Sequence, residues 1–235
     1  MREEAAVQAP GRRRRVRPGS ENGARAGQAR RDSRAAIQAA ALSEFASRGY
    51  SGARIESIAR AAGVDDRLIY YYFGGKDALY RLTLETAYER LNEAESALDL
   101  ASLAPGAALE AVVRFTWRYY LQHPEFITLL NTENLHRGAH IRRSARVRSL
   151  SRPVVGIVDA ILRRGRKSGE FRRSVSSRHV YLAVAALGYF YLSNRYTLSN
   201  FLGVELADAR RLREWETFIV DAIRRLVCRV PGRDE

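Results

Sequence analysis

The 235-residue chain has little cysteine, little lysine and no long apolar run. Its single cysteine, Cys228, rules out an intrachain disulfide and any zinc site built on several thiolates. One of the longest apolar stretches, residues 180–192, is interrupted by small residues and is shorter than the roughly 20 residues of a membrane-spanning helix. No apolar segment accompanies the arginines near the start. We therefore expect no secretory signal, no membrane partner and a cytoplasmic location.

Sequence motifs for catalysis and for nucleotide binding are also missing. The histidines and Cys228 form no Ser/His/Asp or Cys/His signature, and no Gly-rich phosphate loop occurs. Glu133 and His136 form a Glu-x-x-His, with His140 one turn later, whereas a di-iron bundle needs this motif twice. We expect no catalytic residue, no metal and no cofactor. A metal protein or enzyme that uses the Glu133/His136 face is the rival interpretation from another functional class.

Positive charge is abundant and unevenly distributed, with a net charge of +14 and only two lysines, Lys76 and Lys167. Residues 1–34 hold ten arginines and four acidic residues, whereas residues 35–90 hold seven basic and seven acidic residues. Residues 1–31 lack periodicity and are expected to be a disordered Arg-rich arm. The arginine run at 12–17 either contacts DNA phosphates or is a solvated tail. A non-specific nucleic-acid packer is a further alternative.

Helical periodicity fills the remainder of the chain, and no strand alternation stands out, so the expected fold class is all-α. A first helix is expected to begin at Asp32 or Ser33 and to end at Gly49. Further helices are expected at about 55–62, 66–73, 76–91, 107–122, 125–137, 153–166, 178–199 and 208–228. These predict an arm (1–31), a three-helix DNA-binding domain (32–80) and a helical bundle for ligand binding and dimerisation (81–230).

The two short helices around Gly63 have the layout of a helix-turn-helix, whose second helix enters the DNA major groove. Asp65 is expected to cap that second helix. Ile69 and Phe73 lie four residues apart and can face a core, so Tyr70 and Tyr72 point elsewhere, with hydroxyl groups available to phosphates. This segment predicts a protein that binds double-stranded DNA.

Residues 34–80 closely resemble the N-terminal domain of the TetR family of bacterial transcriptional regulators. The matching positions are 37–50, 58–59, 62–64, 69–73 and 76–79. The match is specific because it fixes apolar, glycine and aromatic positions over three helices together. The resemblance implies a homodimer that binds a palindromic operator, usually as a repressor. It also implies that a small molecule bound in the C-terminal domain releases the protein from the operator. A TetR-like activator remains the alternative.

The resemblance also implies particular DNA contacts. The positions that match its phosphate-contacting residues are Tyr70, Tyr72 and Lys76, and those that match its base-reading segment are Asp66, Arg67 and Leu68. The family often has Ser or Thr before the first helix of the motif. This chain has Arg54 there, which is expected to take over the phosphate contact.

Each base-reading residue also has a plainer interpretation. Arg67 either donates two hydrogen bonds to a guanine or contacts a phosphate. Leu68 either touches a thymine methyl group or packs against the preceding helix. Asp66 either turns away from DNA or accepts a hydrogen bond from a cytosine amino group. Tyr71 is expected to be structural.

Aromatic and apolar residues lie on the helices that the family uses around its effector pocket. The expected lining is Trp117, Tyr120, Phe126, Leu130, Tyr181 and Tyr189, with Glu133, Asn134 and Arg137 as polar groups. An ordinary hydrophobic core is the plainer interpretation of the aromatic residues. The basic segment 142–148 is favoured as a solvated surface, and an anionic ligand is the sharper alternative.

The last two helices carry more apolar residues than one buried stripe requires, which predicts a four-helix dimer interface with a second copy. The expected interface residues are Val184, Leu187, Gly188, Tyr191, Leu212, Trp215, Phe218, Ile219, Ala222 and Leu226. Their spacing of three and four residues is that of a helix face, and the small residues among them permit close approach between helices.

Overall fold

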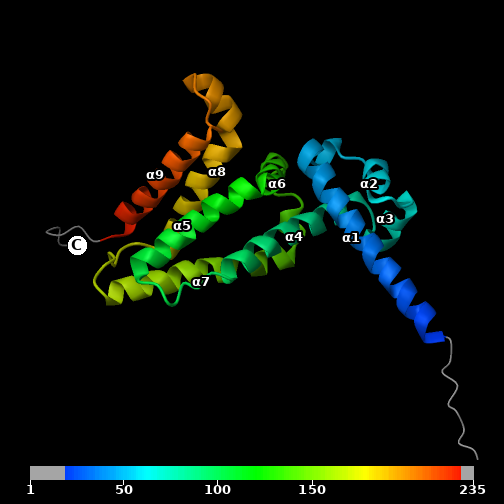
Figure 1. Ribbon diagram of the computed structural model, residues 1–235, viewed down its shortest axis with the longest axis horizontal. Helices are drawn as coiled ribbons and strands as arrows, with labels where there is room; N and C mark the ends of the chain where they lie inside the picture. Colours follow the sequence, from blue (N-terminus) through cyan, green and yellow to red (C-terminus); the bar gives the residue numbers. More distant parts are fainter. Residues whose placement is uncertain (1–18, 229–235) are drawn as a thin grey trace, which may run out of the picture.

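The computed structural model describes residues 19–228, with side chains described for 27–150 and 155–228. Over this part of the chain the fold is all-α, as predicted, and Figure 1 shows its arrangement. The helices are α1 (Gly19–Gly52), α2 (Ile55–Ala62), α3 (Asp66–Phe73), α4 (Lys76–Ser96), α5 (Pro105–Gln122), α6 (Pro124–Leu135), η1 (Ile141–Arg143), α7 (Ala145–Lys167), α8 (Ser177–Leu202) and α9 (Ala209–Val227). No helix in this part of the chain is both long and apolar enough to cross a membrane.

Two helices begin many residues before their predicted starts. Helix α1 begins at Gly19, so the expected start at Asp32 or Ser33 is wrong, and residues 19–31 are helical instead of belonging to a disordered arm. Asp32 accepts a hydrogen bond from Gln28 within the helix instead of capping it. Helix α7 begins at Ala145 rather than 153, because the hydroxyl group of Ser144 caps it by accepting from Val147 N. The arginine run at 12–17 lies outside the described residues.

The first core belongs to the N-terminal helices. Helices α1, α2, α3 and the start of α4 bury a cluster that includes Ile37, Phe45, Ile58, Ile69 and Leu79. Leu129 of α6 joins the same cluster, so α6 packs on α1. Figure 1 shows α4 running from this three-helix head into the larger bundle. The head is therefore attached to the bundle by packed side chains as well as by the chain itself.

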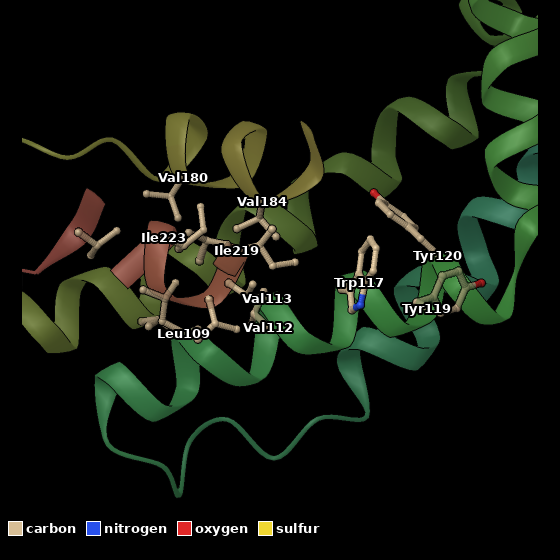
Figure 2. Close-up of a cluster of buried hydrophobic side chains, with 14 of the residues drawn as sticks. Leu109, Val112, Val113, Trp117, Tyr119, Tyr120, Val180, Val184, Ile219 and Ile223 are labelled. Atoms are coloured by element: carbon tan, nitrogen blue, oxygen red, sulfur yellow. The ribbon is translucent and has the colours of Figure 1, made fainter. Parts of the chain in front are cut away.

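The second core lies between α5, α7, α8 and α9. In Figure 2, Val180 and Val184 of α8 face Ile219 and Ile223 of α9, next to Val113 of α5. Ion pairs add to this packing, because Glu216 of α9 pairs with both Arg114 and Arg118 of α5.

This core corrects part of the predicted dimer interface. Val184, Gly188, Tyr191 and Ile219 are buried inside the protomer and offer no free surface. Gly188 is needed within the protomer, because a Cβ atom there would lie 3.1 Å from the Tyr120 ring. Helices α8 and α9 each carry one apolar stripe that faces the protomer core and a second that faces outward. The spacing of apolar residues in the sequence does not distinguish the two stripes.

Candidate DNA-reading head and effector pocket

The turn between α2 and α3 is set by local hydrogen bonds. Gly63 ends α2 in the left-handed conformation (φ 66°), which glycine adopts without strain. Asp65 caps α3 as predicted, because its carboxylate accepts a hydrogen bond from Arg67 N at 2.8 Å. That hydrogen bond is the main cause that lowers the pKa of Asp65. Arg54 does not cap α2 through its side chain, and the carboxylate of Glu44 accepts from its backbone N–H at 3.3 Å.

Helix α3 presents a free polar and aromatic face. Arg67 and Tyr70 are exposed, whereas Ile69 is fully buried beneath them. Asp66 and Leu68 are half-buried. Tyr71 is 72% exposed, so the expectation that it is structural is wrong. Since residues 70 and 71 both project from the helix, the exposed face of α3 is wider than the sequence suggested.

Two of the other predicted phosphate contacts, Tyr72 and Lys76, take part in contacts between a cation and an aromatic ring. The guanidinium group of Arg34 lies 5.7 Å from the centre of the half-buried Tyr72 ring. Lys76 opens α4, and its Nζ lies 4.8 Å from the centre of the Tyr50 ring. A lysine at a helix N-terminus adds its charge to the positive end of the helix dipole, which suits a phosphate. Arg54 is exposed at the start of α2.

A cavity of about 670 Å³ lies between α4, α5, α6, η1, α7 and α8. Six of the nine predicted pocket residues line it: Tyr120, Phe126, Leu130, Asn134, Tyr181 and Tyr189. The prediction missed Tyr88, Leu91, Asn92, Ile141, Arg142, Val147, Arg148, Leu150, Leu182, Ala185 and Ala186. The helical spacing of residues 88, 91 and 92 could have indicated that this face of α4 contributes to the cavity. Because Arg142 and Arg148 both line the cavity, the structure supports the anionic-ligand interpretation of segment 142–148.

Three predicted pocket residues lie elsewhere. Trp117 is buried below the cavity, edge-on to Tyr191, with ring centres 5.6 Å apart. Glu133 is buried and bonded to the chain that follows α6. Arg137 is exposed, in a left-handed conformation (φ 55°) just after that helix. Trp117 and Glu133 lie on helices that were predicted, whereas Arg137 lies beyond the end of α6, and none of the three lines the cavity.

The Glu133/His136 face is committed to internal hydrogen bonds. One oxygen of Glu133 accepts from the backbone N–H groups of His140 (2.7 Å) and Ile141 (2.9 Å). The other oxygen lies 3.0 Å from His140 Nδ1. His136 Nδ1 lies 2.8 Å from the Thr132 carbonyl oxygen. No group of three His, Cys, Asp or Glu residues suited to a metal occurs among the described residues.

Four tyrosines are among the polar residues of the cavity lining. Burial raises the pKa of Tyr88, Tyr120 and Tyr181, so these phenol groups remain protonated. The Tyr189 hydroxyl donates to Asn131 Oδ1 at 2.5 Å and accepts from Asn134 Nδ2 at 3.3 Å. The cavity therefore offers apolar walls with hydrogen-bonding groups at chosen points, as small-molecule sites do.

Aromatic contacts join the reading head to this cavity. The Tyr50 ring, at the end of α1, lies 4.4 Å from the His140 ring and 5.0 Å from the Tyr80 ring. Its hydroxyl group bonds to Asp77 at the start of α4. His140 immediately precedes η1, whose Arg142 lines the cavity. Contacts of Tyr50 thus connect the start of α4 with His140, the residue directly before the η1 residues that line the cavity.

Known proteins resemble the chain over nearly its whole length. Residues 37–82 match the family model for bacterial regulatory proteins of the tetR family, and residues 105–223 match that for the tetracyclin repressor-like C-terminal domain. The HTH-type transcriptional repressor NicS of Pseudomonas putida strain KT2440 is 47% identical over 85% of this chain and 93% of its own length.

Solved structures share the fold. A regulatory protein of the tetR family from Rhodococcus RHA1 superimposes with a TM-score of 0.66 at 19% identity, over 84% of this chain and 98% of that one. FadR from Bacillus subtilis, in complex with stearoyl-CoA, gives 0.60 at 17% identity, over 80% and 96%. With two matching domains and a full-length relative, this chain belongs to the TetR family of bacterial transcriptional regulators.

Proposed function

We propose that this protein is a transcriptional repressor of the cytoplasm that binds a palindromic operator as a homodimer and leaves it when a small molecule fills the cavity. The observation that carries the proposal is the set of contacts around Tyr50 and His140, which connects the reading head to the segment that lines the cavity within one protomer. The name of the NicS repressor and the stearoyl-CoA bound to FadR support the two halves of this function.

In this mechanism α3 enters the major groove with Arg67, Tyr70 and Tyr71 facing the DNA. Lys76, at the start of α4, and Arg54, at the start of α2, contact phosphates on the groove edges. A second copy places its own α3 in the next major groove, roughly 34 Å away. Phosphate contacts fix the position of the head, whereas contacts from α3 to the bases select the sequence.

Release requires that the effector binds the DNA-incompetent arrangement of the dimer more tightly than the competent one. The cavity is lined by α4 and by η1, and both elements continue into contacts with the head. A ligand that shifts either element changes the positions of Lys76 and of the Tyr50 ring, over which the Lys76 ammonium group lies. The separation of the two reading heads then no longer fits the operator.

The DNA half of the proposal is tested by selection from a random duplex library, which should yield a palindrome. Lys76→Ala should weaken binding to every sequence by a similar factor, because phosphates carry no sequence information. Arg67→Ala should change the preferred base at one position of each half-site, with a loss of about 1–3 kcal/mol if it reads a guanine. The control is Arg163→Ala, which removes one exposed charge from α7, far from the head.

Two outcomes would contradict the proposal. Equal affinity for selected and random DNA would indicate a non-specific nucleic-acid packer. Increased transcription from a promoter that carries the selected site would indicate an activator.

A further inference from the structure

A carboxyl group buried beside the cavity has no polar partner among the described side chains. Glu95 follows Asn92 by almost one turn on the face of α4 from which Tyr88, Leu91 and Asn92 line the cavity. It is only 4% exposed, and no group in the described part of the chain forms a hydrogen bond or an ion pair with it. Folded proteins rarely leave such a group unsatisfied, because its burial is costly. A missing partner is therefore the first explanation to consider.

Two hydroxyl groups of the cavity lie within electrostatic reach of Glu95. Burial is the main cause that raises the pKa of Tyr120 on α5 and of Tyr181 on α8, and the charge of Glu95 adds to it in both cases. Burial also raises the pKa of Glu95 to about 7. Glu95 is not itself a lining residue, but Tyr120 and Tyr181 both line the cavity, so the carboxyl group lies next to this part of it, here called the acidic end.

The cavity extends well away from this end. Its lining residues on α8 run from Tyr181 to Tyr189, which corresponds to about 12 Å along the helix axis. At the second end, Tyr189 accepts a hydrogen bond from Asn134 of α6. Apolar side chains such as Leu91, Phe126 and Leu130 form much of the walls, which also include Asn92 and Arg148.

The second end is basic. Ser144, two residues after Arg142, donates a hydrogen bond to Glu85 at 2.6 Å. Glu85 lies ten residues before Glu95, so η1 sits beside α4 about 15 Å from the acidic end. Arg142 is exposed at the cavity, and no described carboxylate pairs with it. Arg142 therefore brings a positive charge to the cavity about 15 Å along α4 from Glu95, and Arg148 of α7 is the other arginine of the lining.

We propose that the effector is a bipolar molecule, with an acidic group that pairs with Arg142, an apolar body, and a protonated or neutral N–H donor that hydrogen-bonds to Glu95. This inference rests on the proposed function, in which the same cavity holds the effector. A charged donor at Glu95 satisfies the buried carboxylate, and such charge-assisted hydrogen bonds are the strong ones. A purely apolar ligand leaves Glu95 without a partner.

Four probes of one shape separate the two charged groups. They are para-(aminomethyl)benzoate with both groups, para-methylbenzoate with the acid, para-methylbenzylamine with the amine, and para-xylene with neither. Calorimetry on the full-length protein should rank the bipolar probe first. Glu95→Gln should lower the affinity for the bipolar probe about ten- to a hundredfold, towards the affinity of the wild type for para-methylbenzoate. Arg142→Gln should lower the affinity for the bipolar probe towards that of the wild type for para-methylbenzylamine.

Matched variants serve as controls. Glu93→Gln removes an exposed carboxylate from the same helix, and Arg143→Gln removes an exposed charge from the same 3-10 helix without touching the cavity lining. Both should bind all four probes as the wild type does. The affinity of the unmodified protein for the bipolar probe should also rise between pH 6 and pH 8, as Glu95 ionises, and Glu95→Gln should abolish that rise.

Several results would overturn the bipolar effector. These are para-xylene binding as tightly as the bipolar probe, an unchanged bipolar affinity in Glu95→Gln, or no binding by any of the four probes. Sequence-specific DNA binding by the wild-type protein, measured in parallel, separates this failure from that of the proposed repressor. If DNA selection succeeds while the probes fail, only the ligand chemistry is wrong.

Discussion

At the scale of single residues, two glycines of α7 have opposite surroundings. Gly165 packs against the buried ring of Phe171, and a Cβ atom there would overlap the ring. Gly156 lies on the same helix with no described atom within 4 Å of such a Cβ. The absence of a side chain is therefore required at the first position and only weakens the helix at the second.

Alanine at these two positions should change stability in opposite directions. Gly165→Ala should lower the free energy of unfolding by about 1–3 kcal/mol, because Phe171 must move. Gly156→Ala should raise it by about 0.5–1 kcal/mol, because alanine favours the helix. Urea denaturation followed by circular dichroism measures both. A Gly165→Ala variant as stable as Gly156→Ala would show that Phe171 is not packed on α7.

Glu95 should make stability depend on pH in a direction unusual for a carboxyl group. Burial raises its pKa in the folded protein to about 7, above its value in the unfolded chain, so the folded state holds the proton more tightly. Its contribution is full below about pH 4 and is lost as the pH rises to 7. The loss is on the order of 3 kcal/mol. Glu95→Gln should remove this dependence, as denaturation at pH 5 and pH 8 would reveal, whereas Glu93→Gln should retain it.

At the scale of elements, the segment from α6 to η1 holds the two functional regions together. Glu133 binds the backbone of His140 and Ile141, so one buried carboxylate fixes the path of residues 136–141. On one side of that path His140 contacts Tyr50 of the head, and on the other side Arg142 reaches the cavity. Glu133 is therefore a positioning residue for both regions, although it lines neither.

Removing that carboxylate should loosen this segment first. Glu133→Ala leaves two buried N–H groups without an acceptor, which should lower the free energy of unfolding by about 3 kcal/mol. Hydrogen exchange at the amides of His140 and Ile141 should accelerate. Glu125→Ala is the control, because Glu125 pairs with the side chain of His123 at the other end of α6. Unaltered exchange at both amides would disprove the positioning role.

The elements also show what sequence patterns can and cannot predict. Periodicity placed α2, α3, α5, α6, α8 and α9 because each has a regular apolar face. It missed the first turns of α7, which are rich in Arg and Ser and are held by contacts with α4. Arg146 pairs with Glu89, and the Leu150 carbonyl accepts from Asn92. Such contacts join residues far apart in the chain, so local patterns do not contain them.

The residues of the candidate site were likewise predicted in part, where the signal is local, and missed where it depends on distant contacts. The residue type of Asp65 was enough to predict the cap of α3, because capping depends on a local hydrogen bond to Arg67 N. The cavity was predicted only in part, because periodicity indicates that a side chain is buried but not against which neighbour. Trp117 and Tyr120 lie three residues apart on α5, yet only Tyr120 lines the cavity, whereas Trp117 packs against Tyr191.

At the scale of the whole molecule, one apolar surface is still without a partner in the protomer. The outer faces of α8 and α9 expose large apolar side chains, namely Phe190, Phe218 and Leu226. Exposed apolar patches of this kind mark association sites. Helices α8 and α9 lie at the far side of the bundle from α3 in Figure 1, so pairing through them leaves both heads free for DNA.

Charges on this outer face should separate the two copies of the proposed homodimer without unfolding them. Phe190 and Phe218 are 57% and 53% exposed, so Phe190→Glu combined with Phe218→Glu leaves the protomer core intact. In the dimer the same carboxylates would be buried without partners, which is strongly unfavourable. Light scattering should detect a folded monomer, and affinity for a palindromic operator should fall about 10²- to 10⁴-fold, because the two half-sites are no longer bound together.

Two further variants make this test specific to the outer face. Leu135→Glu, on α6, places a charge at a side chain that is 81% exposed and should leave the dimer intact. Ile219→Arg should unfold the bundle instead of dissociating it, because Ile219 is 1% exposed within the protomer. If the double Phe variant stays dimeric and still binds the operator, the copies pair elsewhere. If Ile219→Arg gives a folded monomer, the inner stripe of α9 lies at the interface after all.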